Sequence, residues 1–288
     1  MRHSDLHTPA YQATRARLVR RFGEDVTAPW WEGLAETLSL LSTRWRLTIG
    51  EPAGSGNTSL VLRCTMAGRG PAVLKLTPGA GIAEAEAEAL RQWASSGRVP
   101  EVWESDTGAV LLEAVSPSHP GPEVELSEVA ALIRDLHAAG DPSAATRDLR
   151  ERIEFIFGLY RRRHPEARGL AEGKALALRL AAHPPRRVLL HGDLHPGNVL
   201  ADPARGLIAI DPRPCSGDPA VDAVDWVFLS ATSARAWRPR CSELASALDL
   251  GEDRLWAWCA AFAPLLAAGT SDAAVRAELL GLTQFVAE

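Results

Sequence analysis

Hydrophobic and polar positions follow two periodicities along the first 115 residues of the chain. Apolar side chains recur at helical spacing over residues 30–42, which predicts a helix there. Residues 82–93 are rich in Ala, Glu and Leu and predict a second, longer helix. Short apolar runs separated by Gly-rich turns predict antiparallel strands at 45–50, 60–66, 71–76, 99–104 and 109–115.

After a Pro-rich segment at 116–123, the pattern becomes mainly helical. Amphipathic helices are predicted at 126–139, 148–163, 170–182, 220–230, 235–248, 252–266 and 272–286. Short apolar strands are predicted near 188–190, 199–200 and 207–210. Strands first and helices afterwards favour an α+β fold with two lobes, residues 1–115 and 116–288, on either side of a cleft.

Composition narrows the class of protein. Hydrophobic residues make up 46% of the chain and charged residues 23%, as in ordinary folded domains. The net charge of −5 is not the excess of positive charge that nucleic-acid binding requires, and a mildly acidic surface would not repel a cationic small molecule. The chain shows neither a signal-peptide pattern at its start nor a run of about 18 apolar residues. We therefore expect a cytoplasmic protein with a small-molecule partner and no nucleic acid or membrane, while the oligomeric state stays open.

The four cysteines are widely spaced and form no CxxC pair. Neither a zinc knuckle nor a disulfide framework is indicated by such spacing. We expect buried free thiols.

Candidate chemistry is concentrated in two segments, VLLHGDLHPGNVL at 188–200 and LIAIDP at 207–212. Each places an apolar strand beside polar side chains. The interval from Asp193 to Asn198 matches the D-x-x-x-x-N interval of a kinase catalytic loop. Asp211 follows the next predicted strand, at the position of the Asp in the DFG motif of kinases. One carboxylate can orient and deprotonate a hydroxyl, while an amide oxygen and a second carboxylate can hold Mg²⁺. These segments predict a phosphoryl-transfer site.

The same segments, with GDPAVDAVDW after them, resemble the aminoglycoside phosphotransferase family, in particular its streptomycin 6-kinase and hydroxyurea phosphotransferase branch. GEPAGSGNTSLV, AVLKL, EAEALRQW and LLEAV occur in the expected order, so the resemblance covers about residues 45–230. It implies a bilobal protein-kinase-like fold, ATP and Mg²⁺ as cofactors, Asp193 as the catalytic residue, and Asn198 and Asp211 as metal ligands.

Lys75 lies in an apolar strand pattern, where a solvated charge would be misplaced. The chain has 31 basic residues of which only two are lysine, so a retained lysine calls for a specific role. The resemblance implies that Lys75 binds the phosphates and pairs with Glu86. Since Glu84 and Glu88 lie on other faces of the helix, we expect them to be solvated.

The remaining nucleotide contacts are predicted from position. Gly54, Ser55, Gly56 and Asn57 lie between the first two strands, where a loop covers the phosphates, although GSGN is also an ordinary hairpin turn. The backbone of Glu113, Ala114 and Val115 precedes the hinge and is expected to meet adenine.

Two histidines and an aspartate near the catalytic segment are expected to have structural roles. The resemblance suggests that His191 and His195 brace the loop, and that Asp222 supports it from below. A competing interpretation treats His191, Asp193, His195 and Asp211 as a metallohydrolase cluster, but no second HxH or HxxxE pattern completes its ligand shell.

We therefore predict an ATP- and Mg²⁺-dependent O-phosphotransferase acting on a small molecule, with a streptomycin-type antibiotic favoured as the acceptor and resistance as the role. The alternatives are a kinase of hydroxyurea or another small metabolite, and, less favoured, a non-catalytic nucleotide-binding module or the metallohydrolase. The sequence leaves open which carboxylates of the C-terminal helices would bind a cationic acceptor. Glu243, Asp249, Glu252, Asp253 and Asp272 are available.

Overall fold

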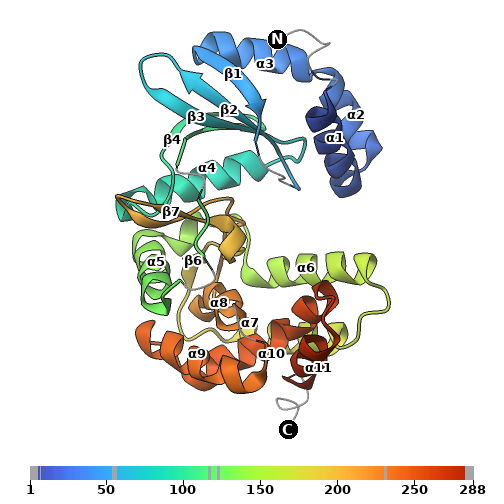
Figure 1. Ribbon diagram of the computed structural model, residues 1–288, viewed down its shortest axis with the longest axis vertical. Coiled ribbons are helices and arrows are strands. Elements are labelled where there is room, and N and C mark those ends of the chain that lie inside the picture. Colours follow the sequence, from blue (N-terminus) through green and yellow to red (C-terminus); the bar gives the residue numbers. More distant parts are fainter. Residues whose placement is uncertain are drawn as a thin grey trace. The chain divides into compact units, whose positions relative to one another are not determined.

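The computed structural model describes residues 6, 8–53, 57–115, 118–121, 124–229 and 232–282. Its chain divides into two compact units (Figure 1). One unit contains Met1–Arg91 and Pro100–Val115, and the other contains Gln92–Val99 and Ser116–Glu288. The chain thus changes unit at three places, whereas the sequence predicts one division, after residue 115.

The first unit is built on a five-stranded antiparallel sheet, as predicted. Its strands, in spatial order, are β1 (Leu47–Pro52), β2 (Leu60–Met66), β3 (Gly70–Leu76), β5 (Ala109–Glu113) and β4 (Val102–Asp106). Lys75 of β3 lies opposite Val61 of β2 and Val110 of β5, so it occupies a central strand. Alternate residues of β2 and β3, such as Leu62 and Leu74, are fully buried in the core of this unit.

Three helices precede this sheet and complete its core: α1 (Pro9–Phe22), α2 (Glu24–Glu32) and α3 (Leu34–Arg44). The single helix predicted over 30–42 is wrong, because Gly33 separates α2 from α3. Helix α1 was not predicted, since it buries only a narrow stripe of Tyr11, Thr14 and Leu18 among many charges. Helix α4 (Ile82–Gln92) follows β3 as expected.

Residues Gln92–Val99 leave the first unit because their side chains pack in the second. Trp93 is fully buried and stacks on His191, with ring centroids 6.1 Å apart and planes 16° apart. Arg98 Nε donates to Asp135 Oδ2 at 2.8 Å, and Arg98 O accepts from the amide of Ala209 at 2.8 Å.

Helices dominate the second unit, as the sequence predicts. They are α5 (Leu126–Ala139), α6 (Leu149–Arg163), α7 (Leu170–Ala182), α8 (Val224–Phe228), α9 (Ala234–Ala247), α10 (Glu252–Gly269) and α11 (Ala273–Leu282). Short 3₁₀ turns are η2 (Ala94–Ser96), η3 (Pro142–Ala144), η4 (Pro196–Asn198) and η5 (Pro219–Ala223). The helix predicted at 220–230 is therefore a 3₁₀ turn followed by α8, and residues 283–286 of the last predicted helix lie outside the described residues.

Two small antiparallel sheets interrupt these helices and carry the segment that is predicted to be catalytic. Strand β6 (Val188–Leu190) pairs with β9 (Cys215–Gly217), and β7 (Val199–Asp202) pairs with β8 (Gly206–Ala209). The sequence predicts three of these strands but not β9. Because β6 and β7 are joined by residues 191–198, the two sheets fix both ends of that loop.

All four cysteines are free and buried, which confirms the expected thiols. Every helix in the described part of the chain is too short or too polar to cross a bilayer.

Candidate active site

A buried carboxylate holds the backbone of the loop between β6 and β7. Asp222 Oδ2 accepts from the amide of His191 and its Oδ1 accepts from the amide of Gly192, both at 2.9 Å. His137 donates through Nε2 to Asp222 Oδ2 at 3.0 Å. Burial raises the pKa of Asp222, but several contributions oppose it, the hydrogen bond and charge of His137 being the largest, and together they hold the pKa below its usual range. Asp222 thus supports the loop, as predicted.

Gly192 makes the turn that leads to Asp193, and its φ of +74° lies in the left-handed region. A Cβ atom at this position would lie 2.2 Å from Arg213 O. The same stretch of backbone is bonded to the loop, because the amide of Arg213 donates to His191 O at 2.8 Å. Only glycine fits between these two segments without moving one of them.

The two histidines of the loop have bracing contacts. His191 is fully buried, and its Nε2 donates to Ile210 O at 3.0 Å. Burial lowers the pKa of His191, so the ring is neutral near pH 7. His195 Nδ1 accepts from the amide of Gly197 at 3.1 Å and closes the turn before Asn198.

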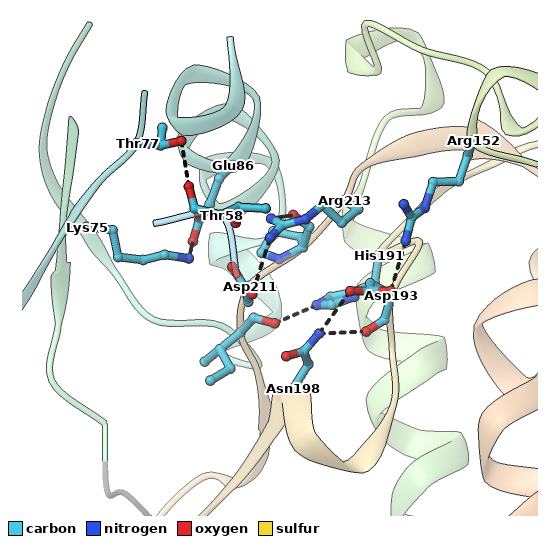
Figure 2. A network of polar contacts seen from close by, with 12 residues as sticks. Thr58, Lys75, Thr77, Glu86, Arg152, His191, Asp193, Asn198, Asp211 and Arg213 are labelled. Carbon is cyan, nitrogen blue, oxygen red and sulfur yellow. Dashed lines mark hydrogen bonds and ion pairs between the residues drawn. The ribbon is translucent and has the colours of Figure 1, made fainter. Parts of the chain in front are cut away.

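Asp193 lies at the end of this braced backbone, and two side chains reach it from two sides (Figure 2). Arg152 Nη2 of α6 donates to Asp193 Oδ1 at 2.8 Å, and Arg152 Nε donates to Gly192 O at 3.0 Å. Asn198 Nδ2 donates to Asp193 O at 2.9 Å and lies 3.4 Å from Asp193 Oδ2. The Asp193 side chain is 34% exposed, so its carboxylate is open to solvent.

Asp211 follows β8 with a φ of +57°, a conformation that non-glycine residues rarely adopt. The preceding amide, of Ile210, donates to Asn198 O at 2.9 Å, so the open end of the β7–β8 pair carries both predicted metal ligands. Arg213 Nη2 lies 3.3 Å from Asp211 Oδ2. The backbone therefore delivers an amide oxygen and a carboxylate to one end of a hairpin.

The metallohydrolase interpretation finds no support in the part of the chain that the structure describes. That part contains no group of three His, Cys, Asp or Glu side chains arranged to hold a metal ion. The Nε2 of His191 is bonded to a backbone carbonyl, and the Nδ1 of His195 is bonded to a backbone amide. Magnesium needs no such group, because it commonly takes one or two protein oxygens and completes its shell with phosphate and water.

In the first unit, Lys75 and Glu86 form a buried ion pair, with Nζ of Lys75 2.5 Å from Oε1 of Glu86 (Figure 2). Their side chains are 9% and 1% exposed. Glu84 and Glu88 are exposed, and Glu84 Oε1 accepts from the amide of Gly108 at 3.0 Å. Of the three glutamates on α4, Glu86 alone is buried beside the lysine, although its role in phosphate binding stays a prediction.

Three residues of the predicted phosphate-covering loop, Gly54, Ser55 and Gly56, lie outside the described residues. Asn57 is exposed. The polypeptide after it is anchored to the end of β3, because Thr77 Oγ1 donates to Thr58 O at 2.7 Å.

The segment predicted to meet adenine ends the sheet of the first unit. The amide of Glu113 donates to Glu101 O at 2.9 Å, and the amide of Ala114 donates to Pro71 O at 3.3 Å. Among the described residues, the amide of Val115 has no such backbone partner. Val115 is therefore the member of this segment whose N–H could reach a nucleotide base.

Several residues that shape the loop were not predicted from the sequence: Arg152, Trp93, His137 and Asp225. Asp225 is half-buried in the first turn of α8. Burial raises its pKa to about 6; positive charge on His195 acts against this rise, and negative charge on Asp193 adds to it. In the sequence, each of them is a single polar or aromatic residue within a helical pattern, and nothing there identifies the residue that it contacts. Its partner becomes visible only in the folded chain.

The C-terminal carboxylates named from sequence include several with structural partners. Glu252 and Asp253 lie 3.4 and 3.6 Å from Arg238, and Asp272 Oδ1 accepts from the first amides of α11. The Asp225 side chain, by contrast, makes no hydrogen bond and no ion pair with any described residue, although the charges of His195 and Arg152 act on it.

Three features together are typical of the kinase-like phosphotransferases of small molecules. They are a Lys–Glu pair beside a five-stranded antiparallel sheet, an Asp and an Asn five positions apart in a braced loop, and a second Asp after the next hairpin. The model of the family "Aminoglycoside/hydroxyurea antibiotic resistance kinase" matches residues 44–274. The chain belongs to this family.

Two curated relatives are named for hydroxyurea and for streptomycin. The chain is 33% identical over 251 residues to the hydroxyurea phosphotransferase of Kitasatospora aureofaciens, covering 83% of this chain and 73% of that protein. It is 31% identical over 266 residues to the streptomycin 6-kinase of Streptomyces glaucescens, covering 84% of each.

Solved structures with low sequence identity share the fold. The choline kinase of Streptococcus pneumoniae matches with a TM-score of 0.62 at 13% identity, over 88% of this chain and 98% of that one. The macrolide 2'-phosphotransferase of Brachybacterium faecium matches with a TM-score of 0.55 at 18% identity, over 88% and 98%. The protein-kinase-like fold is thereby confirmed.

Proposed function

We propose that the protein transfers the γ-phosphoryl group of ATP to a hydroxyl of a cationic, streptomycin-type antibiotic. The observation that carries this proposal is the half-exposed Asp193 carboxylate on a loop whose backbone is fixed by Asp222. In the reaction, the acceptor oxygen forms a bond to the γ-phosphorus while the bond from that phosphorus to the bridging oxygen of ADP breaks. Asp193 takes the hydroxyl proton.

For the nucleotide, we assign Lys75 to the phosphates, with Glu86 holding its ammonium group in place. Because the pair is buried, Lys75 has few alternative positions and its charge is weakly screened. The Val115 amide is assigned to the adenine ring, and the loop Gly54, Ser55, Gly56 and Asn57 to the phosphates. Solved structures with a similar fold include a choline kinase in complex with AMP and an aminoglycoside phosphotransferase in complex with GDP, which supports the use of a purine nucleotide.

For the metal, we assign Mg²⁺ to the side-chain oxygens of Asn198 and Asp211. The Asn198 Nδ2 group is used by Asp193 O, which leaves Oδ1 as the atom for a cation. Hard oxygen donors of this kind suit Mg²⁺. When bound, the ion neutralises charge on the phosphates as the phosphoryl group moves.

A cationic acceptor is favoured over a neutral one by Asp225. This half-buried carboxylate adds negative charge close to Asp193 and forms no ion pair with a described residue, although the charges of His195 and Arg152 act on it. The guanidinium groups of streptomycin could form one. Hydroxyurea, the acceptor named for another relative, is uncharged and would leave Asp225 unpaired, so it is the alternative. Since ATP is supplied in the cytoplasm, we place the reaction there.

The test is a panel of streptomycin, hydroxyurea and choline incubated with the protein and Mg-ATP. ADP release and product mass are followed, with Asp193→Asn as the matched control. We expect phosphorylated streptomycin from the wild type at a rate far above that of the control. If only hydroxyurea were phosphorylated, it would replace streptomycin as the proposed acceptor. If the wild type formed no more product than Asp193→Asn with any of the three compounds, the proposal would be refuted.

A further inference from the structure

We propose that Arg152 is a positioning residue for the phosphoryl transfer, holding the Asp193 carboxylate so that Oδ2 is the atom that accepts the proton from the acceptor. This inference rests on the proposed function and assigns a role to a residue outside the motif segments. Its basis is the pair of contacts that one guanidinium makes with two consecutive residues of the loop.

The guanidinium spans the peptide just before the carboxylate and the carboxylate itself. Nε donates to Gly192 O at 3.0 Å and Nη2 donates to Asp193 Oδ1 at 2.8 Å (Figure 2). The first bond fixes the planar guanidinium on the backbone, and the second holds Oδ1, so the two together restrict the position and orientation of the carboxylate. Because the Arg152 side chain is only 16% exposed, water screens these bonds weakly.

The two oxygens of Asp193 therefore differ. Oδ1 is occupied by Arg152, whereas Oδ2 has only the long, 3.4 Å approach of Asn198 Nδ2. That amide group makes its shorter bond, 2.9 Å, to the backbone carbonyl of Asp193. Oδ2 is thus the oxygen that retains room for a hydroxyl donor, and Arg152 determines which way it faces.

The helix that carries Arg152 is fixed independently of the guanidinium. Asp148 caps α6 by accepting from the amide of Glu151 at 3.1 Å, and the amide of Ser216 in β9 donates to Arg147 O at 2.9 Å. Leu149 and Ile153, on either side of Arg152, are buried. The helix should therefore keep its place when the guanidinium is removed.

Arg152→Ala is expected to lower kcat by about 10²-fold, the size of effect that a misplaced catalytic group produces. The KM for ATP should stay within about twofold, since Arg152 contacts no residue assigned to the nucleotide. Added guanidinium ion should restore part of the lost turnover, which a purely structural defect would not allow. Arg150→Ala is the matched control, because Arg150 is an exposed arginine of the same helix with no partner among the described residues.

A second measurement tests whether Arg152 acts through Asp193. In the Asp193→Asn background, Arg152→Ala should cost less than about twofold, because the carboxylate that it positions is already absent. If Arg152→Ala fails to fold by circular dichroism, Arg152→Lys serves instead, with an intermediate loss expected because an ammonium cannot make both bonds.

Turnover of Arg152→Ala within about threefold of the wild type would overturn the inference, as would additive losses in the double variant or a large rise in the KM for ATP. These outcomes leave phosphoryl transfer by the wild type intact. If the wild type phosphorylates no acceptor, the proposed function fails first, and the inference falls with it.

Discussion

Replacing Gly192 by alanine tests the backbone geometry of the proposed catalytic loop. Two costs add at this position. A non-glycine residue in the left-handed region costs about 1–2 kcal/mol. In addition, the new Cβ would lie 2.2 Å from Arg213 O, a backbone atom that cannot rotate away. Relief of such overpacking costs about 1–3 kcal/mol.

The summed cost is about 2–5 kcal/mol, which lowers the melting temperature by at least about 4 °C for a unit of this size. The displacement also matters for activity, because Gly192 immediately precedes Asp193. A shift of about 1 Å in a catalytic group can cost about 10²-fold in rate. Differential scanning calorimetry and steady-state turnover measure the two effects.

Gly97→Ala is the matched control. Gly97 belongs to the same unit and has a φ of +68°, but a Cβ atom there would meet nothing within 4 Å. It should show the backbone cost alone and keep full turnover. If Gly192→Ala melted within about 1 °C of Gly97→Ala and kept the wild-type kcat, the close packing of Gly192 against Arg213 would be refuted.

Four further predictions concern charged residues. Asp193→Asn should keep ATP binding but lose about 10²- to 10⁴-fold in transfer rate, because the proposed proton acceptor is gone; calorimetry and steady-state rates check this. Lys75→Arg should be strongly impaired although its charge is kept, because a guanidinium cannot replace the ammonium held by Glu86; unchanged turnover and KM for ATP would contradict it. Asp211→Ala should weaken ATP binding with Mg²⁺ but not without it, and calorimetry under both conditions tells the two apart. Asp225→Asn should raise the melting temperature at pH 8 but not at pH 4. The folded-state pKa of Asp225, about 6, lies above the unfolded value, so its ionisation removes stability as pH rises through that interval; an equal change at both pH values would contradict this.

Local periodicity was enough to predict most of the fold. Helices α5 and α7 and strands β2 and β6 begin and end where their apolar patterns do. Each of these elements buries one regular stripe or a short continuous run, so its own residues carry the signal. Strand β9 does not, because Cys-Ser-Gly has no alternation and pairs with β6 only through a contact distant in sequence.

The site shows the same division between local and distant information. Asp193, Asn198 and Asp211 could be named from sequence because their spacing along one short segment encodes their geometry. Arg152 and His137 could not, since they lie 41 and 85 positions from the residues that they contact. Only the packing of α5 and α6 against the strands brings them to the loop.

The composition of the chain explains why Lys75, and not Arg152, could be recognised from the sequence as a functional basic residue. With 31 basic residues and two lysines, 29 are arginine, so Lys75 differs from its background while Arg152 resembles 28 others. The distinguishing property of Arg152 is that its side chain is only 16% exposed and its guanidinium is bonded to the loop, whereas many arginines of this chain are exposed. Burial of that charge costs free energy unless its partners are charged or well oriented. The position of Arg152 therefore couples the first turn of α6 to the orientation of the Asp193 carboxylate. The double variant with Asp193→Asn measures this coupling.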